Sequence, residues 1–180
     1  MASKIKVDTL ETANGSGTIA LSNQLSGMTT ASLPTLTSAE MPSGSVLQVV
    51  SATNTYDAQG GYLVQTSSST FVAAALAVSI TPSSTSSKIM VFFNTSVYRA
   101  SHSGYLTVYR DSTNIAGADG LAAPTGGNPT WIPVGVQYLD SPNTTSSVQY
   151  TLFARSQSGI FYVGGDNDLI NSITVMEIQG

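Results

Sequence analysis

Short runs of β-branched, aromatic and other apolar residues recur from Ser45 to the end of the chain, and turn residues separate them. The turns include Gly60-Gly61 and the sequence GGNP at 126–129, which interrupt regular structure. No segment shows the apolar spacing of a helix. Short strands at regular intervals are typical of a β-sandwich or barrel. We expect eight strands, at residues 46–51, 71–80, 89–98, 105–109, 131–138, 148–154, 160–163 and 173–178.

Two of these runs show the two-residue repeat of a strand with one buried face. Ile173 and Val175 alternate with Thr174 and Met176, and the sequence YLTVY at 105–109 alternates in the same way. We therefore expect sheets in which one face is packed and the other is open.

Charged residues are rare, with six Lys and Arg and ten Asp and Glu among 180 residues, beside 27 Ser and 22 Thr. The formal net charge is −4 and the basic residues are scattered, so we expect no binding to nucleic acid, which needs clustered Lys and Arg. The longest apolar run, residues 71–78, is far shorter than the ~20 residues that span a bilayer, so we expect no membrane insertion. The chain has no Cys and therefore no disulfide or zinc thiolate site.

Residues 1–44 differ from the rest and form an N-terminal arm ahead of a domain at residues 45–180. Residues 22–45 are rich in Ser, Thr, Pro and Gly and carry a single charge, at Glu40. Such a segment buries too little apolar area to offset its own ordering entropy. We therefore expect partner chains to hold the arm. The docking residues that we expect are its apolar positions Ile5, Val7, Leu10, Ile19 and Leu21.

Two groups of residues could carry chemistry, and each has a simpler interpretation. His102 is the only histidine, and no nucleophile-elbow sequence supports a Ser-His-Asp triad. Asp166 and Asp168 could form an acid pair for glycoside hydrolysis or, with Asn167 and Asn171, bind Ca²⁺. Gly, Asp and Asn also favour tight turns, which is the interpretation that we prefer. We expect no enzyme, no metal ion and no cofactor, with a surface-glycan depolymerase as the less favoured alternative.

Several short motifs resemble the virion appendage and tail-fibre proteins of bacteriophages, especially marine and cyanobacterial phages. They are ITPSS at 80–84, SKI at 87–89, LDSPNTT at 139–145 and ITVMEI at 173–178, and the opening KIKVDTL at 4–10 is similar to the virion-proximal start of such proteins. The resemblance implies an all-β jelly-roll sandwich similar to tumour necrosis factor and complement globular-head domains. It also implies a homotrimer with an extended N-terminal arm.

This resemblance implies a function in the virion. We expect a phage structural protein, a short trimeric tail fibre or adhesin head that contacts a glycan or protein of the host surface. Its arm would dock on other virion proteins. A capsid decoration or spike protein, or another structural protein of the phage head or tail, is the alternative, and it differs in where the arm docks.

Three residues near expected turns are candidates for receptor binding. Arg99 and His102 flank one turn, and Trp131 follows the GGNP sequence of another. Aromatic rings and a guanidinium stack on sugars and hydrogen-bond to them, and loops on a rigid scaffold commonly carry such contacts. Packing in the core is the simpler interpretation of Trp131, because a lone large aromatic residue beside a strand usually buries most of its surface.

Overall fold

The computed structural model describes residues 37, 40–54, 61–99, 103–125, 127–165 and 169–180. It divides the chain into two compact units, Met1–Leu36 and Thr37–Gly180, and every described strand lies in the second unit. The described residues are all-β, as the sequence predicts. No helix among them is long and apolar enough to cross a membrane. The predicted docking positions of the arm, from Ile5 to Leu21, lie outside the described residues.

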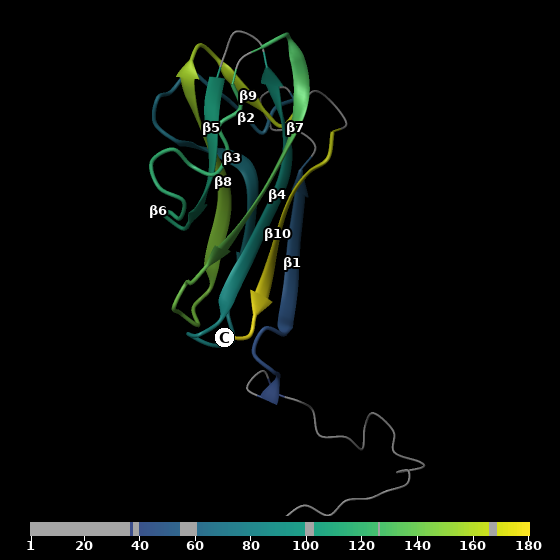
Figure 1. The fold of residues 1–180 in the computed structure, drawn as a ribbon, viewed down its shortest axis with the longest axis vertical. Helices are drawn as coiled ribbons and strands as arrows, with labels where there is room; N and C mark the ends of the chain where they lie inside the picture. Colours follow the sequence, from purple (N-terminus) through teal and green to yellow (C-terminus); the bar gives the residue numbers. More distant parts are fainter. Residues whose placement is uncertain (1–36, 38–39, 55–60, 100–102, 126, 166–168) are drawn as a thin grey trace, which may run out of the picture. The chain divides into compact units, whose positions relative to one another are not determined.

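The strands form two antiparallel sheets (Figure 1). Sheet A contains β1 (Val46–Asn54), β2 (Val64–Thr66), β4 (Lys88–Arg99), β7 (Thr130–Asp140), β9 (Phe161–Val163) and β10 (Asn171–Ile178). Sheet B contains β3 (Val72–Ile80), β5 (Ser103–Arg110), β6 (Thr113–Asn114) and β8 (Val148–Ser158).

Strand β4 is the centre of sheet A. One of its edges pairs with β7 along nearly its whole length, and the other edge pairs first with β10 and then, near Tyr98, with β9. Strand β1 continues the sheet beyond β10, and β2 continues it beyond β9. Sheet B has the order β3-β8-β5-β6. Most sheet neighbours are therefore distant in the sequence.

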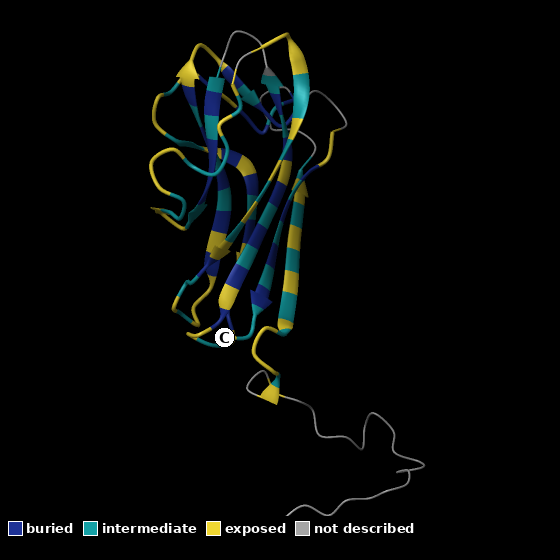
Figure 2. Ribbon diagram, in the orientation of Figure 1, coloured by how far each residue is buried: buried dark blue, intermediate teal, exposed yellow. Residues whose placement is uncertain are grey.

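The two sheets share one hydrophobic core, an arrangement consistent with a β-sandwich. Val91 and Phe93 of β4 and Leu76 and Leu152 of sheet B are each at most 2% exposed. Buried and partly exposed residues alternate along β4 and β10 (Figure 2), so a single face of sheet A enters the core. Each fully buried side chain of this size contributes ~1.5 to 3 kcal/mol, and the core is the main source of stability.

The predicted alternation holds on β10, and on β5 with one exception. Leu106 and Val108 face the core, but Thr107, on the opposite face, is also fully buried. Its hydroxyl donates to Asn114 Oδ1 at 2.8 Å, and Gly120 lies against its side chain. The chain after β6 thus returns over this part of β5 and covers a position that would otherwise be open to solvent.

A buried polar group links the two sheets where β7 ends. Asp140 Oδ2 accepts hydrogen bonds from Arg110 Nη1 at 2.6 Å and from the Tyr150 hydroxyl at 2.7 Å, and both donors belong to sheet B. Burial is the main cause that raises the pKa of Tyr150, and the hydrogen bond to this carboxylate raises it further. The contacts satisfy a carboxylate that would otherwise be costly to bury.

A second buried carboxylate, Glu177 of β10, lies at the same end and is fully buried. Its Oε1 accepts hydrogen bonds from the backbone amide of Ser83, the Ser83 hydroxyl and the Ser87 hydroxyl, each at 2.7 Å. Its Oε2 accepts from Gln48 Nε2 at 2.6 Å. Burial alone would raise the pKa of Glu177, but these hydrogen bonds hold it below its ordinary value of 4.5. The carboxylate therefore joins β1, the β3–β4 turn and β10.

Candidate functional site

Apart from Lys88 at the start of β4, the described side chains on the outer face of the four long strands of sheet A are uncharged. Along β4 the odd-numbered residues from Ile89 to Val97 are buried in the core, so the even-numbered ones face outward. Strand pairing aligns them with residues of β1, β10 and β7 in rows that cross the sheet. We call this surface the uncharged face: Val49, Ser51, Thr53, Ser172, Thr174, Met176, Met90, Phe92, Asn94, Ser96, Pro133, Gly135, Gln137 and Leu139.

One row of the uncharged face is entirely apolar. Val49 pairs with Met176, Met176 with Met90, and Met90 with Leu139, so four hydrophobic side chains lie side by side across four strands. Val49 is 54% exposed and Leu139 is 49% exposed. Lys88 borders this strip in the next row of β4, where its Nζ donates to the Ser141 hydroxyl at 2.8 Å. An apolar strip with a polar rim is typical of a surface that another molecule covers.

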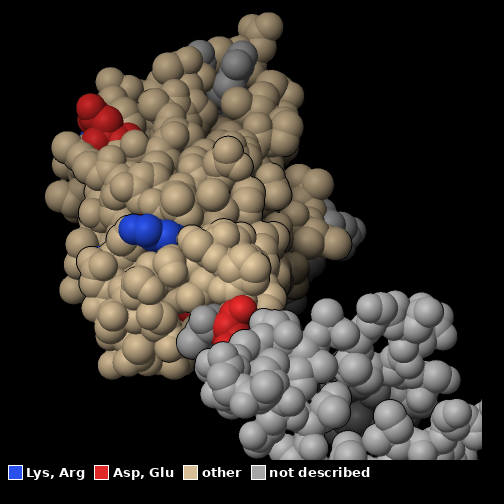
Figure 3. Space-filling model, turned by 60° about the horizontal axis from the view of Figure 1, so that its bottom comes forward, with Lys and Arg blue, Asp and Glu red and all other residues tan. Residues whose placement is uncertain are grey.

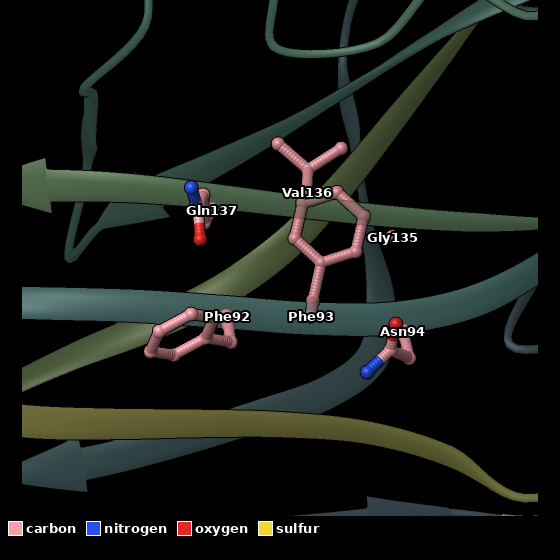
Figure 4. A pocket seen from close by; sticks show the side chains of 6 residues that line it. All are labelled: Phe92, Phe93, Asn94, Gly135, Val136 and Gln137. Carbon is pink, nitrogen blue, oxygen red and sulfur yellow. The ribbon is translucent and has the colours of Figure 1, made fainter.

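The next rows are polar but also uncharged. The hydroxyls of Ser51 and Thr174 are hydrogen-bonded to each other. A hollow of about 330 Å³ lies over β4 and β7, where Gly135 has no side chain opposite Asn94 (Figure 4). Phe92 and Asn94 extend to the same side of β4 around this hollow, whereas Phe93 lies on the other side. The face is therefore contoured and not flat.

Four aromatic rings form a closed group at the end of the uncharged face where β4 ends and β7 begins. Strand register places Tyr98 of β4 between Trp131 of β7 and Tyr162 of β9, and Tyr62 precedes β2. The centroid distances around the group are 5.3 Å for Tyr98–Trp131, 5.9 Å for Trp131–Tyr62, 5.1 Å for Tyr62–Tyr162 and 6.1 Å for Tyr162–Tyr98. The rings line a hollow of about 270 Å³. We call this group the aromatic quartet.

Asn171 organises the chain beside the quartet. Its Nδ2 donates to the carbonyl oxygens of Gly164 at 2.8 Å and Asn54 at 3.1 Å, and its Oδ1 accepts from the Thr95 hydroxyl at 2.9 Å. The neighbouring Ile170 is 70% exposed and helps to line a second hollow of about 190 Å³. A buried side-chain amide thus fixes the backbone beside the quartet while apolar side chains there remain exposed.

Sheet B carries a different aromatic group on its outer face. Tyr109 stacks on Phe153 with the ring centroids 4.0 Å apart, and the Arg155 guanidinium lies 3.8 Å from the centroid of Tyr105 and 5.3 Å from that of Phe71. Arg155 also forms an ion pair with Asp119 at 3.0 Å. The chain itself therefore provides a cation for these rings.

Of the three predicted receptor-binding residues, Trp131 is the one whose side chain the structure describes. It is half-buried, lies on the outer face of sheet A and is not part of the core, so the interpretation as a core residue was wrong. Arg99 is the last residue of β4, and its side chain lies outside the described part of the chain, as do His102, Asp166 and Asp168.

Sequence reasoning did not propose Tyr62, Tyr98 or Tyr162 as site residues. Tyr98 and Trp131 are direct cross-strand partners although 33 positions separate them, so only the strand register shows that they meet.

Within the described ranges, no group of three or more His, Asp or Glu side chains could hold a metal ion. Compared with known proteins, the chain matches no family model and no curated protein sequence.

Proposed function

We propose that this chain is a structural protein of a bacteriophage virion, the head of a short trimeric appendage that contacts the host surface. The observation that carries the proposal is the uncharged face of sheet A. The resemblance of the motifs at 4–10, 80–89, 139–145 and 173–178 to virion appendage proteins supports the phage origin. The role is one of assembly and binding and not of catalysis.

The strand order supports a finer description of the two sheets as a jelly roll. In an eight-stranded jelly roll, successive strands cross repeatedly between two four-stranded sheets. Without the short β2 and β9, the order in sheet A is β1-β10-β4-β7 and that in sheet B is β3-β8-β5-β6. These orders support the proposal of a jelly roll similar to tumour necrosis factor and complement head domains.

The uncharged face supports association of identical copies. Cores of protein interfaces are depleted in charged residues and enriched in aromatic residues and Met, and this face carries Met90, Met176 and Phe92. Elsewhere the chain is also poor in charge, and charged side chains form only small separate groups in the view of Figure 3. Exposed Val49 and Leu139 would lose their contact with water on association. The number three comes from the resemblance.

The two ends of the domain suit different tasks. The backbone amide of Gly44 donates to the carbonyl of Gln179 at 2.8 Å, so the chain that follows the arm joins the sheets beside the C-terminus, at the end of β10. The aromatic quartet lies near the opposite end of β4. An appendage that is anchored through residues 1–44 would thus carry Trp131 at the end of the domain away from Gly44, which supports host contact by Trp131 and, as the sequence predicts, by Arg99 and His102.

Removal of residues 1–36 is expected to abolish incorporation into particles while the unit Thr37–Gly180 still folds. Full-length variants Ile5→Asp and Leu10→Asp should lose incorporation in the same way, because a charge at a docking position opposes burial. The measurement is quantitative immunoblotting of purified particles of the encoding phage, with circular dichroism as the control for folding.

Gold-labelled antibody against the chain should bind to a tail-associated appendage. Labelling over the capsid would instead identify a decoration protein. The virion role would be wrong if purified particles contain no copy of the full-length chain.

A further inference from the structure

We propose that the aromatic quartet is a binding site for a quaternary ammonium group. The proposal names a ligand class for the end of sheet A to which we assign host contact, and in that sense it rests on the proposed function. Binding to purified protein can nevertheless be measured without any reference to a virion, so the two can fail separately.

The first argument is geometric. Tyr62, Tyr98, Trp131 and Tyr162 each contact two others, so the rings close around a hollow and do not form an open stack. The hollow of about 270 Å³ is slightly smaller than the ~300 to 1,000 Å³ of sites for drug-sized molecules. It therefore suits a small compact group, and the chain to which that group is attached can extend outward from the sheet.

The second argument is electrostatic. The faces of aromatic rings are negative, and a cation within ~6 Å of a ring centroid is attracted to them. On sheet B the chain supplies this cation itself, because the Arg155 guanidinium lies over the rings of Tyr105 and Phe71. Over the quartet, no Lys or Arg side chain within the described ranges takes this place. A cation from outside can therefore occupy it, and the net charge of −4 favours its approach.

The third argument selects the kind of cation. The hollow is lined by the four aromatic residues alone, and no described carboxylate or amide side chain lines it. Among the lining side chains, a primary ammonium or a sugar ring that loses hydrogen bonds to water there could recover them only from the three tyrosine hydroxyls and the indole N–H. A quaternary ammonium has a positive charge but no N–H group, so it needs ring faces and no acceptors. Aromatic cages recognise choline and methylated lysine on this principle.

Trp131 is the only tryptophan of the chain, so its fluorescence reports on the quartet alone. We expect the full-length protein to show a saturable change in tryptophan fluorescence with tetramethylammonium and with choline. Sodium chloride at equal ionic strength and 3,3-dimethylbutanol, the neutral isostere of choline, should give no saturable change, because the attraction depends on the charge.

Substitutions test whether choline binding depends on the aromatic faces of the quartet. Tyr98→Leu should weaken choline binding by about tenfold or more, since a cation–π contact is lost, while Tyr98→Phe should retain it within about threefold. Tyr109→Leu in sheet B is the matched control and should leave binding unchanged. Calorimetric titration of the unmodified protein provides a second measurement if the Leu variant fails to fold.

Lipid vesicles distinguish two sources of the quaternary ammonium group, a lipid headgroup and a free small solute. Binding to phosphatidylcholine vesicles but not to phosphatidylglycerol vesicles would identify a lipid headgroup, and binding to free choline alone would identify a small solute. The proposal is overturned if neither cation binds, if the neutral isostere binds equally well, or if acrylamide fails to quench Trp131 because another copy covers the quartet. None of these results would affect the detection of the chain in purified particles.

Discussion

Met90→Glu is expected to convert the associated protein into monomers. Met90 lies at the centre of the apolar row, between Met176 and Leu139, and the neighbouring cation Lys88 already donates to the Ser141 hydroxyl at 2.8 Å. In a trimer that buries this row, each copy would bring a carboxylate into the interface, and pairing it with Lys88 would require that cation to leave Ser141 and lose its water as well, at a cost of several kcal/mol per site. The association constant should fall by more than about a thousandfold. Sedimentation velocity at micromolar concentration measures the result.

Two matched variants make this experiment specific. Met90→Gln has a similar length but no charge and should weaken association far less than Met90→Glu. Gln149→Glu places the same carboxylate on an exposed position of sheet B and should leave the mass unchanged. If Met90→Glu keeps the mass of the parent protein, the uncharged face is not the contact between copies.

Glu177→Gln is expected to lower the free energy of unfolding by about 2 to 4 kcal/mol at pH 7, because an amide cannot accept all four hydrogen bonds that the buried carboxylate receives. The amide group would also face the Gln48 side-chain amide, which is a donor. Chemical denaturation at a fixed protein concentration measures the difference, since association changes the apparent stability.

The difference between parent and Glu177→Gln should depend on pH. The folded-state pKa of Glu177 lies below its ordinary value of 4.5, so its carboxylate stabilises the fold fully above that pH. This stabilisation is lost as the pH falls from about 4.5 through the folded-state pKa. The two proteins should therefore differ most near pH 7 and least near pH 2. A difference that stays constant across this range would show that the ionised carboxylate does not stabilise the fold.

The sequence predicted most of the strands, because each long strand carries its own periodicity. All eight expected runs are strands, although the ends differ: the run at 46–51 extends to Asn54, and that at 160–163 begins at Phe161. The prediction missed β2 and β6, which have three and two residues. Alternation cannot be recognised over such lengths, and these strands depend on their partners β9 and β5.

The candidate site was less predictable than the strands. Trp131 was identified from its residue type and its place after a turn, but its aromatic partners depend on pairing between strands that are far apart in the sequence. The uncharged face likewise requires the register of β1, β10, β4 and β7. Thr107 shows the same limit, because its burial comes from a later segment that folds back over it.

The mass of the full-length protein in solution tests the central claim that copies associate through the uncharged face. Light scattering coupled to size exclusion should give about 56 kDa at micromolar concentration, which is three times the chain mass of 18.6 kDa. A single species of 18.6 kDa with the circular dichroism of a folded β protein would contradict the claim.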